Sequence, residues 1–509
     1  MNRKIGVILS YILMVFEVLS TLLLTPFIIR TLGDSEYGVY KLSAAIVAYL
    51  LLLDLGVGNA VTRYVAKYRA QGNTLMCRRF LGITTIYYSA IAALCLVVGV
   101  VLIFLYPTVF ATGLSQDEIA LGQRLLSITI INTAVTLGSV GFKNAIIAYE
   151  RFDVSRGMSI IMIIIRIACT FGALKLGFGS IGIVSVNLMM TVITNVFFAL
   201  FVIFKLKLKP IFRGITSSLV KEVAVYSSFI LIQMIATQIN ACADQILLGM
   251  FVEASAVIIA VYSVGQQITQ YFQSIGSSVT GVLMPGVVKL VESKATPKQL
   301  CDEMIRIGRL ILMVLGLIWS GFLVFGRQFI TLWVGAEKLD AYWVTMILMT
   351  AQLFILTEAI GTQILWSMNE HKEQSILKIS IVVVNVFLTI ALIQWNPLYG
   401  ATIGTFISLM LGDIGVMNLI FVKKIKIKLS TYYLGLFKGI IPSMLIAIAA
   451  GFGFSFIGLS GWIGLGVNVL VVVAVYLIAM SLFGMNRYEK DLIFGMIKKV
   501  FRRPSHKKA

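Results

Sequence analysis

Charged residues are scarce in this sequence. Only 13% of its 509 residues are Asp, Glu, Lys or Arg, whereas 59% are hydrophobic. Because soluble domains carry roughly 25% charged residues, this composition excludes a soluble multidomain protein. A membrane-spanning helix needs about 20 residues, so a chain of this length has room for roughly a dozen spans or more.

Residues that usually carry catalysis or bind metals are also few. The chain has two His residues, His371 and His506, and five Cys residues that are scattered without a CxxC pair. It contains no GxxxxGK[ST] phosphate loop, no GxSxG and no HExxH. These absences predict no metal site, no disulfide framework and no cofactor, and they indicate that the chain is not an enzyme. Any uphill work must therefore draw on ion or substrate gradients.

Long apolar runs are what the sequence does contain. Fourteen of them reach spanning length, near residues 5–29, 38–58, 80–105, 119–147, 157–177, 180–204, 223–250, 256–288, 307–333, 341–367, 375–393, 399–422, 434–457 and 462–484. A spanning segment has to satisfy its own backbone hydrogen bonds, so each run is predicted to be a helix. The expected fold class is an all-α, polytopic membrane protein with about 14 transmembrane helices.

The distribution of basic residues supports this count and orients the chain. The net charge is +20, which in a soluble protein would suggest nucleic-acid binding. With the N-terminus inside, however, 33 of the 42 Lys and Arg residues fall in inside segments and only 5 in outside segments. Basic residues concentrate on the cytoplasmic side, so both termini are predicted to be cytoplasmic, with no nucleic-acid partner. The first apolar run begins at Ile5 and contains Glu17, which favours a retained first helix over a cleaved signal.

The spacing of the runs suggests an internal repeat. Runs 7 to 12 begin 218 to 227 residues after runs 1 to 6. This offset predicts two six-helix lobes related by a parallel repeat, with a substrate at their interface, followed by two extra helices. The expected domains are 1–210 for the N-terminal lobe, 211–428 for the C-terminal lobe, 429–485 for helices 13 and 14, and 486–509 for a basic amphipathic cytoplasmic tail.

Several charged residues lie at membrane depth, where a charge costs about 2.5–3.5 kcal/mol on insertion scales. They are Glu17 in helix 1, Asp54 near the end of helix 2, Arg124 and Lys143 in helix 4, Arg166 in helix 5, Asp244 in helix 7, Glu358 in helix 10 and Asp413 in helix 12. Structural alternatives remain open at this stage. Arg166 could pair with Glu17, Arg124 and Lys143 could extend to the two interfaces, and Asp54 could serve a helix end.

Polar side chains form stripes on three predicted helices. The stripes are Tyr262, Gln266, Thr269, Gln273, Ser277 and Thr280 on helix 8, Gln233, Thr237, Asn240 and Asp244 on helix 7, and Asn132, Thr136, Ser139 and Lys143 on helix 4. Steps of three and four residues place each stripe on one helical face. Such faces indicate a water-filled cavity, or else hydrogen bonds between helices.

The stretch from Leu32 to Asn73 resembles the beginning of a known family. Its features are Leu32-Gly33, Tyr37-Gly38, Asp54-Leu55-Gly56 and Arg63-Tyr64. The chain resembles the bacterial polysaccharide transporters that flip O-antigen and capsule repeat units, within the multidrug/oligosaccharidyl-lipid/polysaccharide flippase superfamily. The pattern of six, six and two spans extends the resemblance over the whole chain.

The resemblance implies a flippase in the bacterial inner membrane. Its substrate would be an undecaprenyl-diphosphate-linked oligosaccharide, moved by alternating access for cell-surface polysaccharide synthesis, with membrane lipids and a polysaccharide polymerase as partners. A cationic cavity would accept the diphosphate through Arg124, Lys143 and Arg166. Sugar hydroxyls would meet the polar residues Gln233, Asn240, Tyr262, Gln266 and Gln273. Coupling to H⁺ or Na⁺ would involve Glu17 and Asp244, and gating would involve Asp54 and Arg63.

Two other functions stay open from the sequence. An ion-coupled antiporter for amphipathic cationic drugs would need an acidic cavity and usually has twelve spans, whereas Arg124, Lys143 and Arg166 are basic. A membrane-embedded glycosyltransferase or polymerase would usually carry a long outer loop, and no loop of this chain is that long.

Overall fold

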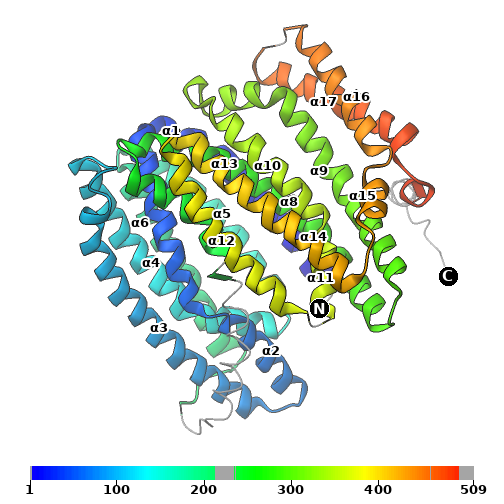
Figure 1. The fold of residues 1–509 in the computed structure, drawn as a ribbon. Coiled ribbons are helices and arrows are strands. Elements are labelled where there is room, and N and C mark those ends of the chain that lie inside the picture. The colour runs from blue at the N-terminus through cyan, green and yellow to red at the C-terminus, as the bar shows by residue number, and fades with distance from the viewer. Residues whose placement is uncertain (1–2, 213–233, 236, 369, 459, 492–509) are drawn as a thin grey trace, which may run out of the picture. The chain divides into compact units, whose positions relative to one another are not determined.

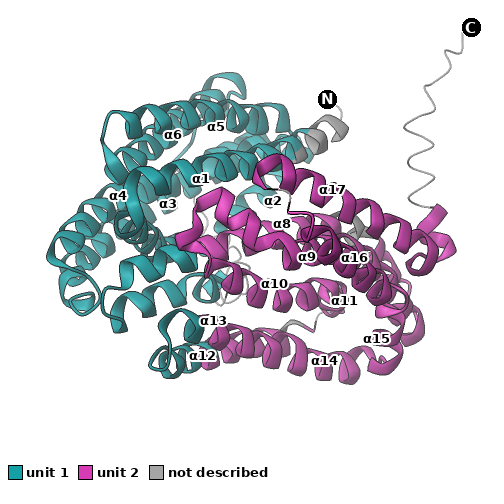
Figure 2. Ribbon diagram, turned by 90° about the horizontal axis from the view of Figure 1, so that it is seen from above, with its two compact units in different colours: residues 1–263, 385–401 teal, residues 264–384, 402–509 magenta. Residues whose placement is uncertain are grey.

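The computed structural model describes residues 3–212, 234–235, 237–368, 370–458 and 460–491 (Figure 1). Within these residues every regular element is a helix and none is a strand, which confirms the all-α class. The chain divides into two compact units (Figure 2). Unit 1 comprises Met1–Ser263 and Asn385–Ala401, and unit 2 comprises Val264–Val384 and Thr402–Ala509. The predicted division into lobes at residue 210 stays a prediction.

The helices are long and apolar enough to confirm a polytopic membrane fold. Nine helices of the described residues could cross a membrane, or up to twelve if each of three bent pairs is one span. The first of these stretches, Ile12–Ala70, covers most of the first predicted span and all of the second. The predicted seventh span, 223–250, is described only in part. Residues 223–233 and 236 lie outside the described residues, and residues 237–251 are helical.

Unit 1 is built on the first part of the chain. Its helices are α1 (Arg3–Ala48), η1 (Tyr49–Asp54), α2 (Val57–Ala70), α3 (Thr74–Val109), α4 (Gln116–Ala148), α5 (Phe152–Lys175), α6 (Gly179–Leu200) and η2 (Phe201–Lys205), together with residues 237–251. Helix α4 packs against α1, α2, α3 and α6, and α5 packs against α1 and α6. Helix α4 is therefore the element around which the rest of unit 1 is arranged.

Two motifs of the sequence mark the points where the first helices break. Gly33 has φ 73° and ψ 175° inside α1, so α1 is two helices joined at a kink, at the boundary between the first two predicted spans. Leu55 and Gly56 have φ of 53° and 74°, and the chain turns there from η1 into α2. Glycine adopts such left-handed backbone readily because it lacks a Cβ atom.

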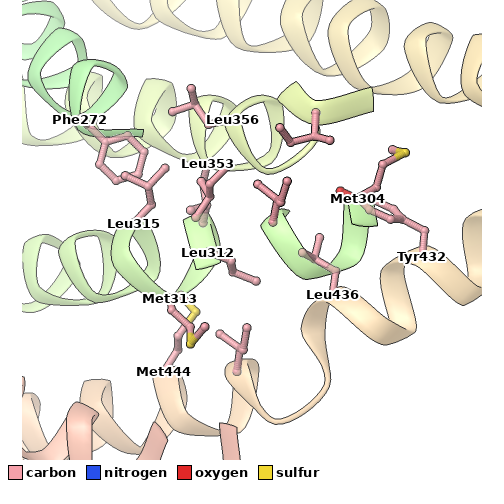
Figure 3. Close-up of a cluster of buried hydrophobic side chains, with 14 of the residues drawn as sticks. Phe272, Met304, Leu312, Met313, Leu315, Leu353, Leu356, Tyr432, Leu436 and Met444 are labelled. Atoms are coloured by element: carbon pink, nitrogen blue, oxygen red, sulfur yellow. The ribbon is translucent and has the colours of Figure 1, made fainter. Parts of the chain in front are cut away.

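Unit 2 holds most of the second part of the chain. Its helices are most of α8 (Ser255–Glu292), α9 (Pro297–Val334), η3 (Ala336–Lys338), α10 (Ala341–Thr357), α11 (Ala359–Ser367), parts of α12 (His371–Ile393) and α13 (Pro397–Leu409), η4 (Met410–Val416), α14 (Met417–Ile420), η5 (Phe421–Ile425), α15 (Leu429–Phe437), α16 (Ile440–Ser455), α17 (Gly461–Ala479) and η6 (Met480–Gly484). Helix α9 packs against α10, α15, α16 and α17. Figure 3 shows Leu312, Leu315 and Met313 of α9 inside the resulting core.

The two predicted C-terminal spans correspond to α15, α16 and α17. Helices α15 and α16 form a bent pair with an angle of 40°, and the break falls at Lys438 and Gly439, where Gly439 has φ 76°. Helix α17 continues through η6 to Gly484. Most of the predicted amphipathic tail, residues 492–509, lies outside the described residues.

Candidate functional site

A cavity of about 610 Å³ lies within unit 1, among α1, α4, α5 and α6. Most of the residues that line it are polar or charged. The lining residues are Glu17, Asn132, Thr136, Ser139, Val140, Lys143, Asn144, Ser159, Met162, Ile163, Arg166, Asn187, Met190, Thr191, Thr194, Asn195 and Phe198. In a chain built of membrane-spanning helices, such a polar space is suited to a hydrophilic guest that hydrocarbon would exclude.

The polar stripe predicted on helix 4 forms one wall of this cavity. All four of its members, Asn132, Thr136, Ser139 and Lys143, line the space. The Thr136 hydroxyl donates to the Asn132 carbonyl oxygen at 2.8 Å, and Ser139 donates to the Thr136 carbonyl oxygen at 2.9 Å. These protons are used within the helix, which leaves the hydroxyl oxygens able to accept hydrogen bonds.

Three charged side chains from three helices meet in the cavity wall. Lys143 comes from α4, Arg166 from α5 and Glu17 from α1. Among the described residues, none of the three side chains forms an ion pair or a hydrogen bond, so the pairing of Arg166 with Glu17 that the sequence left open is not formed. Two cations and one carboxylate give the cavity a net positive charge, which favours an anionic guest.

Arg124 does not belong to this group. It lies on α4 as Lys143 does, but 19 residues nearer the helix start, which is about 28 Å along the axis. Its side chain is exposed and is not part of the cavity wall. The grouping of Arg124 with Lys143 and Arg166 is therefore wrong in space, because a shared helix does not bring residues so far apart together.

Polar residues predicted on helices 7 and 8 form hydrogen bonds between helices and do not line this cavity. Asp244 is 2% exposed, and it accepts hydrogen bonds from the Tyr262 hydroxyl and from Thr389 Oγ1, the latter at 3.1 Å. Asn385 Nδ2 donates to Asn240 Oδ1 at 3.5 Å. These residues thus form hydrogen bonds between helices, the alternative that the sequence left open.

Three further residues of these stripes were predicted to bind the substrate. Gln266 is half-buried and Gln273 is exposed, and neither lines the cavity of unit 1. Gln233 lies outside the described residues. Asn385 and Thr389 were missed from the sequence, although their spacing of four residues on the predicted eleventh span puts them on one face.

The two residues predicted to gate lie at the break after η1. Asp54 accepts a hydrogen bond from the Tyr88 hydroxyl at 2.6 Å and from the backbone of Gly56 and Gly58. A carboxylate that accepts hydrogen bonds from backbone groups just beyond it is typical of a residue at a helix end. This was the structural alternative for Asp54 that the sequence left open. Arg63 is exposed on α2, with its guanidinium carbon 6.0 Å from the centre of the Tyr64 ring. Gating by either residue stays a prediction.

Helix α6 contributes a wall that the sequence reasoning missed. Asn187, Thr191, Thr194 and Asn195 all line the cavity. Steps of four and three residues between the first three place them on one helical face, which is the signal that identified the stripe on α4. Asn195 Nδ2 donates to the Val135 carbonyl oxygen of α4 at 3.3 Å, which fixes the two walls together.

Metal ligation does not explain the cavity. Among the described residues, no group of three or more His, Cys, Asp or Glu side chains lies close enough to hold a metal ion. The five cysteines are free, and Cys77, Cys95 and Cys301 are buried.

Comparisons with known proteins identify a family and a fold for this chain. Residues 4–291, more than half of the chain, match the family described as "Polysaccharide biosynthesis protein". The fold is similar to that of the lipid II flippase MurJ in its inward closed conformation, with a TM-score of 0.70 and 16% identity over 96% of this chain and 100% of that one. No curated relative matches the sequence.

Multidrug transporters of the MATE family share the fold less closely. An inward-facing member of the MOP superfamily gives a TM-score of 0.57 at 14% identity, over 80% of this chain and 98% of that chain. An outward-facing member gives 0.55 at 15% identity, over 83% and 95%. At these identities the likeness establishes the fold and leaves the cargo to be argued from the site.

Proposed function

Because the chain belongs to the family of polysaccharide biosynthesis proteins, we propose that it is a flippase for a lipid-linked oligosaccharide. It moves an undecaprenyl-diphosphate-linked sugar unit across the bacterial cytoplasmic membrane by alternating access. The observation that carries this proposal is the polar cavity of unit 1, with Lys143 and Arg166 unpaired in its wall.

The chemistry of the cavity suits the two polar parts of such a cargo. A diphosphate with attached sugars cannot cross hydrocarbon without polar partners. Lys143 and Arg166 supply charge-assisted hydrogen bonds to phosphate oxygens, which are stronger than bonds between neutral groups. The amides of Asn132, Asn187 and Asn195 supply donors and acceptors for sugar hydroxyls.

Ion coupling is a finer part of the proposal. Glu17 lies in the cavity wall without a partner cation, where a proton or Na⁺ would compete with Lys143 and Arg166 for the same carboxylate. Asp244 is the second candidate, because its carboxylate is buried between Tyr262 and Thr389. The bias of basic residues predicts that both termini are cytoplasmic. The flipped product would pass to a polysaccharide polymerase.

The other two functions have less support. A drug antiporter shares the fold, but a cavity with two cations and one carboxylate repels cationic drugs. A glycosyltransferase usually groups several acidic or His side chains in its active site, whereas Glu17 is the single acidic residue and no His is present among the residues that line the cavity.

The decisive experiment reconstitutes the full chain into liposomes that contain a fluorescent undecaprenyl-diphosphate-linked oligosaccharide. Flipping is scored as protection from an external glycosidase. Arg166→Ala is expected to lower the rate about tenfold or more, since one charged hydrogen bond contributes about 1.5–3 kcal/mol.

Arg124→Ala is the matched control, because it removes the same charge from an exposed position outside the cavity. Arg166→Lys keeps the charge and is expected to be milder than Arg166→Ala. If Arg166→Ala and Arg124→Ala flip equally well at equal protein abundance, the cavity does not carry the cargo.

A further inference from the structure

Glu358 occupies a break in a membrane-spanning stretch of unit 2. It lies between α10 and α11, which are bent by 41° at this residue, and its side chain is 3% exposed. The carbonyl oxygen of Thr357 accepts a hydrogen bond from the Tyr432 hydroxyl at 3.1 Å. The break therefore lies against α15, and it places an acidic side chain inside the protein.

Three side chains from three elements form a closed triangle at this break. The Tyr433 hydroxyl of α15 donates to Glu358 Oε1 at 2.5 Å. Asn418 Nδ2 of α14 donates to the same Oε1 at 3.1 Å and to the Tyr433 hydroxyl oxygen at 2.7 Å. One carboxylate oxygen thus receives both donors.

Two oxygen atoms of the triangle have no donor among the described residues. Glu358 Oε2 and Asn418 Oδ1 are both buried without a hydrogen-bond partner, and Asn418 is 5% exposed. A buried carboxylate oxygen without a partner costs several kcal/mol, so an atom of this kind needs a partner such as a proton, a water molecule or an ion.

No cation of the described residues neutralises Glu358. The titratable groups around it are Tyr432 and Tyr433 of α15, Cys301 of α9 and Asp413 of η4. Asp413 is itself held by an ion pair with Lys378. All of these neighbours are neutral or acidic, and the Lys378 ammonium that accompanies Asp413 is already paired with that carboxylate.

We propose that Glu358, Asn418 and Tyr433 form a binding site for a small monovalent cation, either a proton or Na⁺. A single carboxylate with an amide oxygen balances one positive charge, whereas a divalent ion would need more carboxylates. The bound cation neutralises Glu358 at the point where α10 bends into α11. The site joins that bend to α14 and α15, and it shares no residue with the cavity of unit 1.

The test measures cation binding to the purified full-length protein and uses no transport assay. Its result is therefore independent of whether the chain is a flippase. Thermal unfolding is compared in NaCl and in choline chloride at constant ionic strength. Infrared spectra are recorded for the carbonyl stretch of a protonated carboxyl group. Glu358→Gln removes the charge with little change of shape, and Glu370→Gln, at a more exposed carboxylate, is the matched control.

Each result decides the proposal. A rise in melting temperature with Na⁺ in the native chain and in Glu370→Gln, but not in Glu358→Gln, identifies Na⁺. A protonated-carboxyl band that Glu358→Gln alone removes, without a Na⁺ response, identifies the proton. If neither the Na⁺ response nor the band differs between Glu358→Gln and the native chain, the proposal is overturned.

A second variant covers the case in which Glu358→Gln does not fold. Asn418→Ala keeps the carboxylate and removes the amide oxygen and its donors. It is expected to raise the Na⁺ concentration at half-effect about tenfold for a Na⁺ site, or to move the band for a proton site. An unchanged response in both measurements would equally reject the site.

Discussion

Unit 1 has Lys143 and Arg166 on the wall of a cavity of about 610 Å³, whereas unit 2 buries Arg309 against Glu489 at 2.6 Å. Arg309 also donates to the carbonyl oxygens of Gly435, Leu436, Lys438 and Gly484. The basic residues of the cavity have no protein partner among the described residues, and the basic residue of unit 2 has all its donors committed. The same residue types are thus available for a guest in one unit and used for architecture in the other.

The polar cavity of unit 1 also contrasts with an apolar cavity of unit 2, although unit 1 has an apolar cavity of about 440 Å³ as well. Unit 2 has a cavity of about 310 Å³ between α9 and α17, and its walls are formed by Leu, Ile, Val, Phe and Gly residues. Such a space offers nothing to a diphosphate or a sugar. If the proposed cargo binds in unit 1, substitutions of charged residues should affect transport in unit 1 and folding in unit 2.

The largest effect is expected for Arg309→Ala. Removing this guanidinium leaves Glu489, which is 0% exposed, as an unpaired buried charge. It also frees four carbonyl oxygens, in the last turn of α15, at Lys438 just after it and at the end of η6. Breaking a buried pair on one side typically costs about 3–5 kcal/mol. We expect a large fall in melting temperature, measured by thermal unfolding in detergent, and low abundance in the membrane.

Arg306→Ala is its control on the same helix. The Arg306 side chain is 44% exposed and pairs with Glu303 at 3.1 Å, so its loss is expected to cost about 1 kcal/mol or less. Equal melting temperatures for the two variants would show that charge in unit 2 is not architectural.

The all-α membrane fold followed from the sequence because spanning helices are long, apolar and locally determined. The break at Gly33 falls between the first two predicted spans, whereas the break at Gly56 falls inside the predicted second span. On α4 the polar stripe pointed to the cavity correctly, because residues at steps of three and four share a face.

The partners of each stripe could not be predicted in this way. Periodicity gives the face of a helix but not the helix that covers it, so the stripe with Asp244 gave no sign that Thr389 would cover it. Arg124 and Lys143 shared a helix and a charge, and only the packing of α5 and α6 shows which of them the cavity reaches. Glu358 had no partner in the sequence because Asn418 and Tyr433 are 60 and 75 residues away.

A second, smaller effect tests whether unit 1 depends on close backbone packing instead of charge. A Cβ atom added to Gly38 of α1 would lie 1.8 Å from the carbonyl oxygen of Ala256, which is backbone and cannot turn aside. Gly38→Ala is therefore expected to cost about 1–3 kcal/mol in thermal unfolding. Gly172→Ala in α5 is the control, because nothing lies within 4 Å of its added Cβ, and it should be neutral or slightly stabilising. Equal melting temperatures would mean that the contact at Gly38 is not needed for stability.

The smallest change in stability is expected for Lys143→Ala. This variant is the most direct test of the contrast between the charged residues of the two units. The Lys143 side chain is exposed to the cavity and has no hydrogen bond or ion pair among the described residues, so nothing in the folded protein loses a partner when it is removed. Such substitutions usually change the free energy of unfolding by about 0.5 kcal/mol or less. Transport of the lipid-linked oligosaccharide should nevertheless fall about tenfold, because a phosphate oxygen loses a charged donor. Lys143→Arg keeps the charge and should retain most of the rate. A melting temperature lowered as far as in Arg309→Ala would show that Lys143 is architectural, and the contrast between the units would then fail.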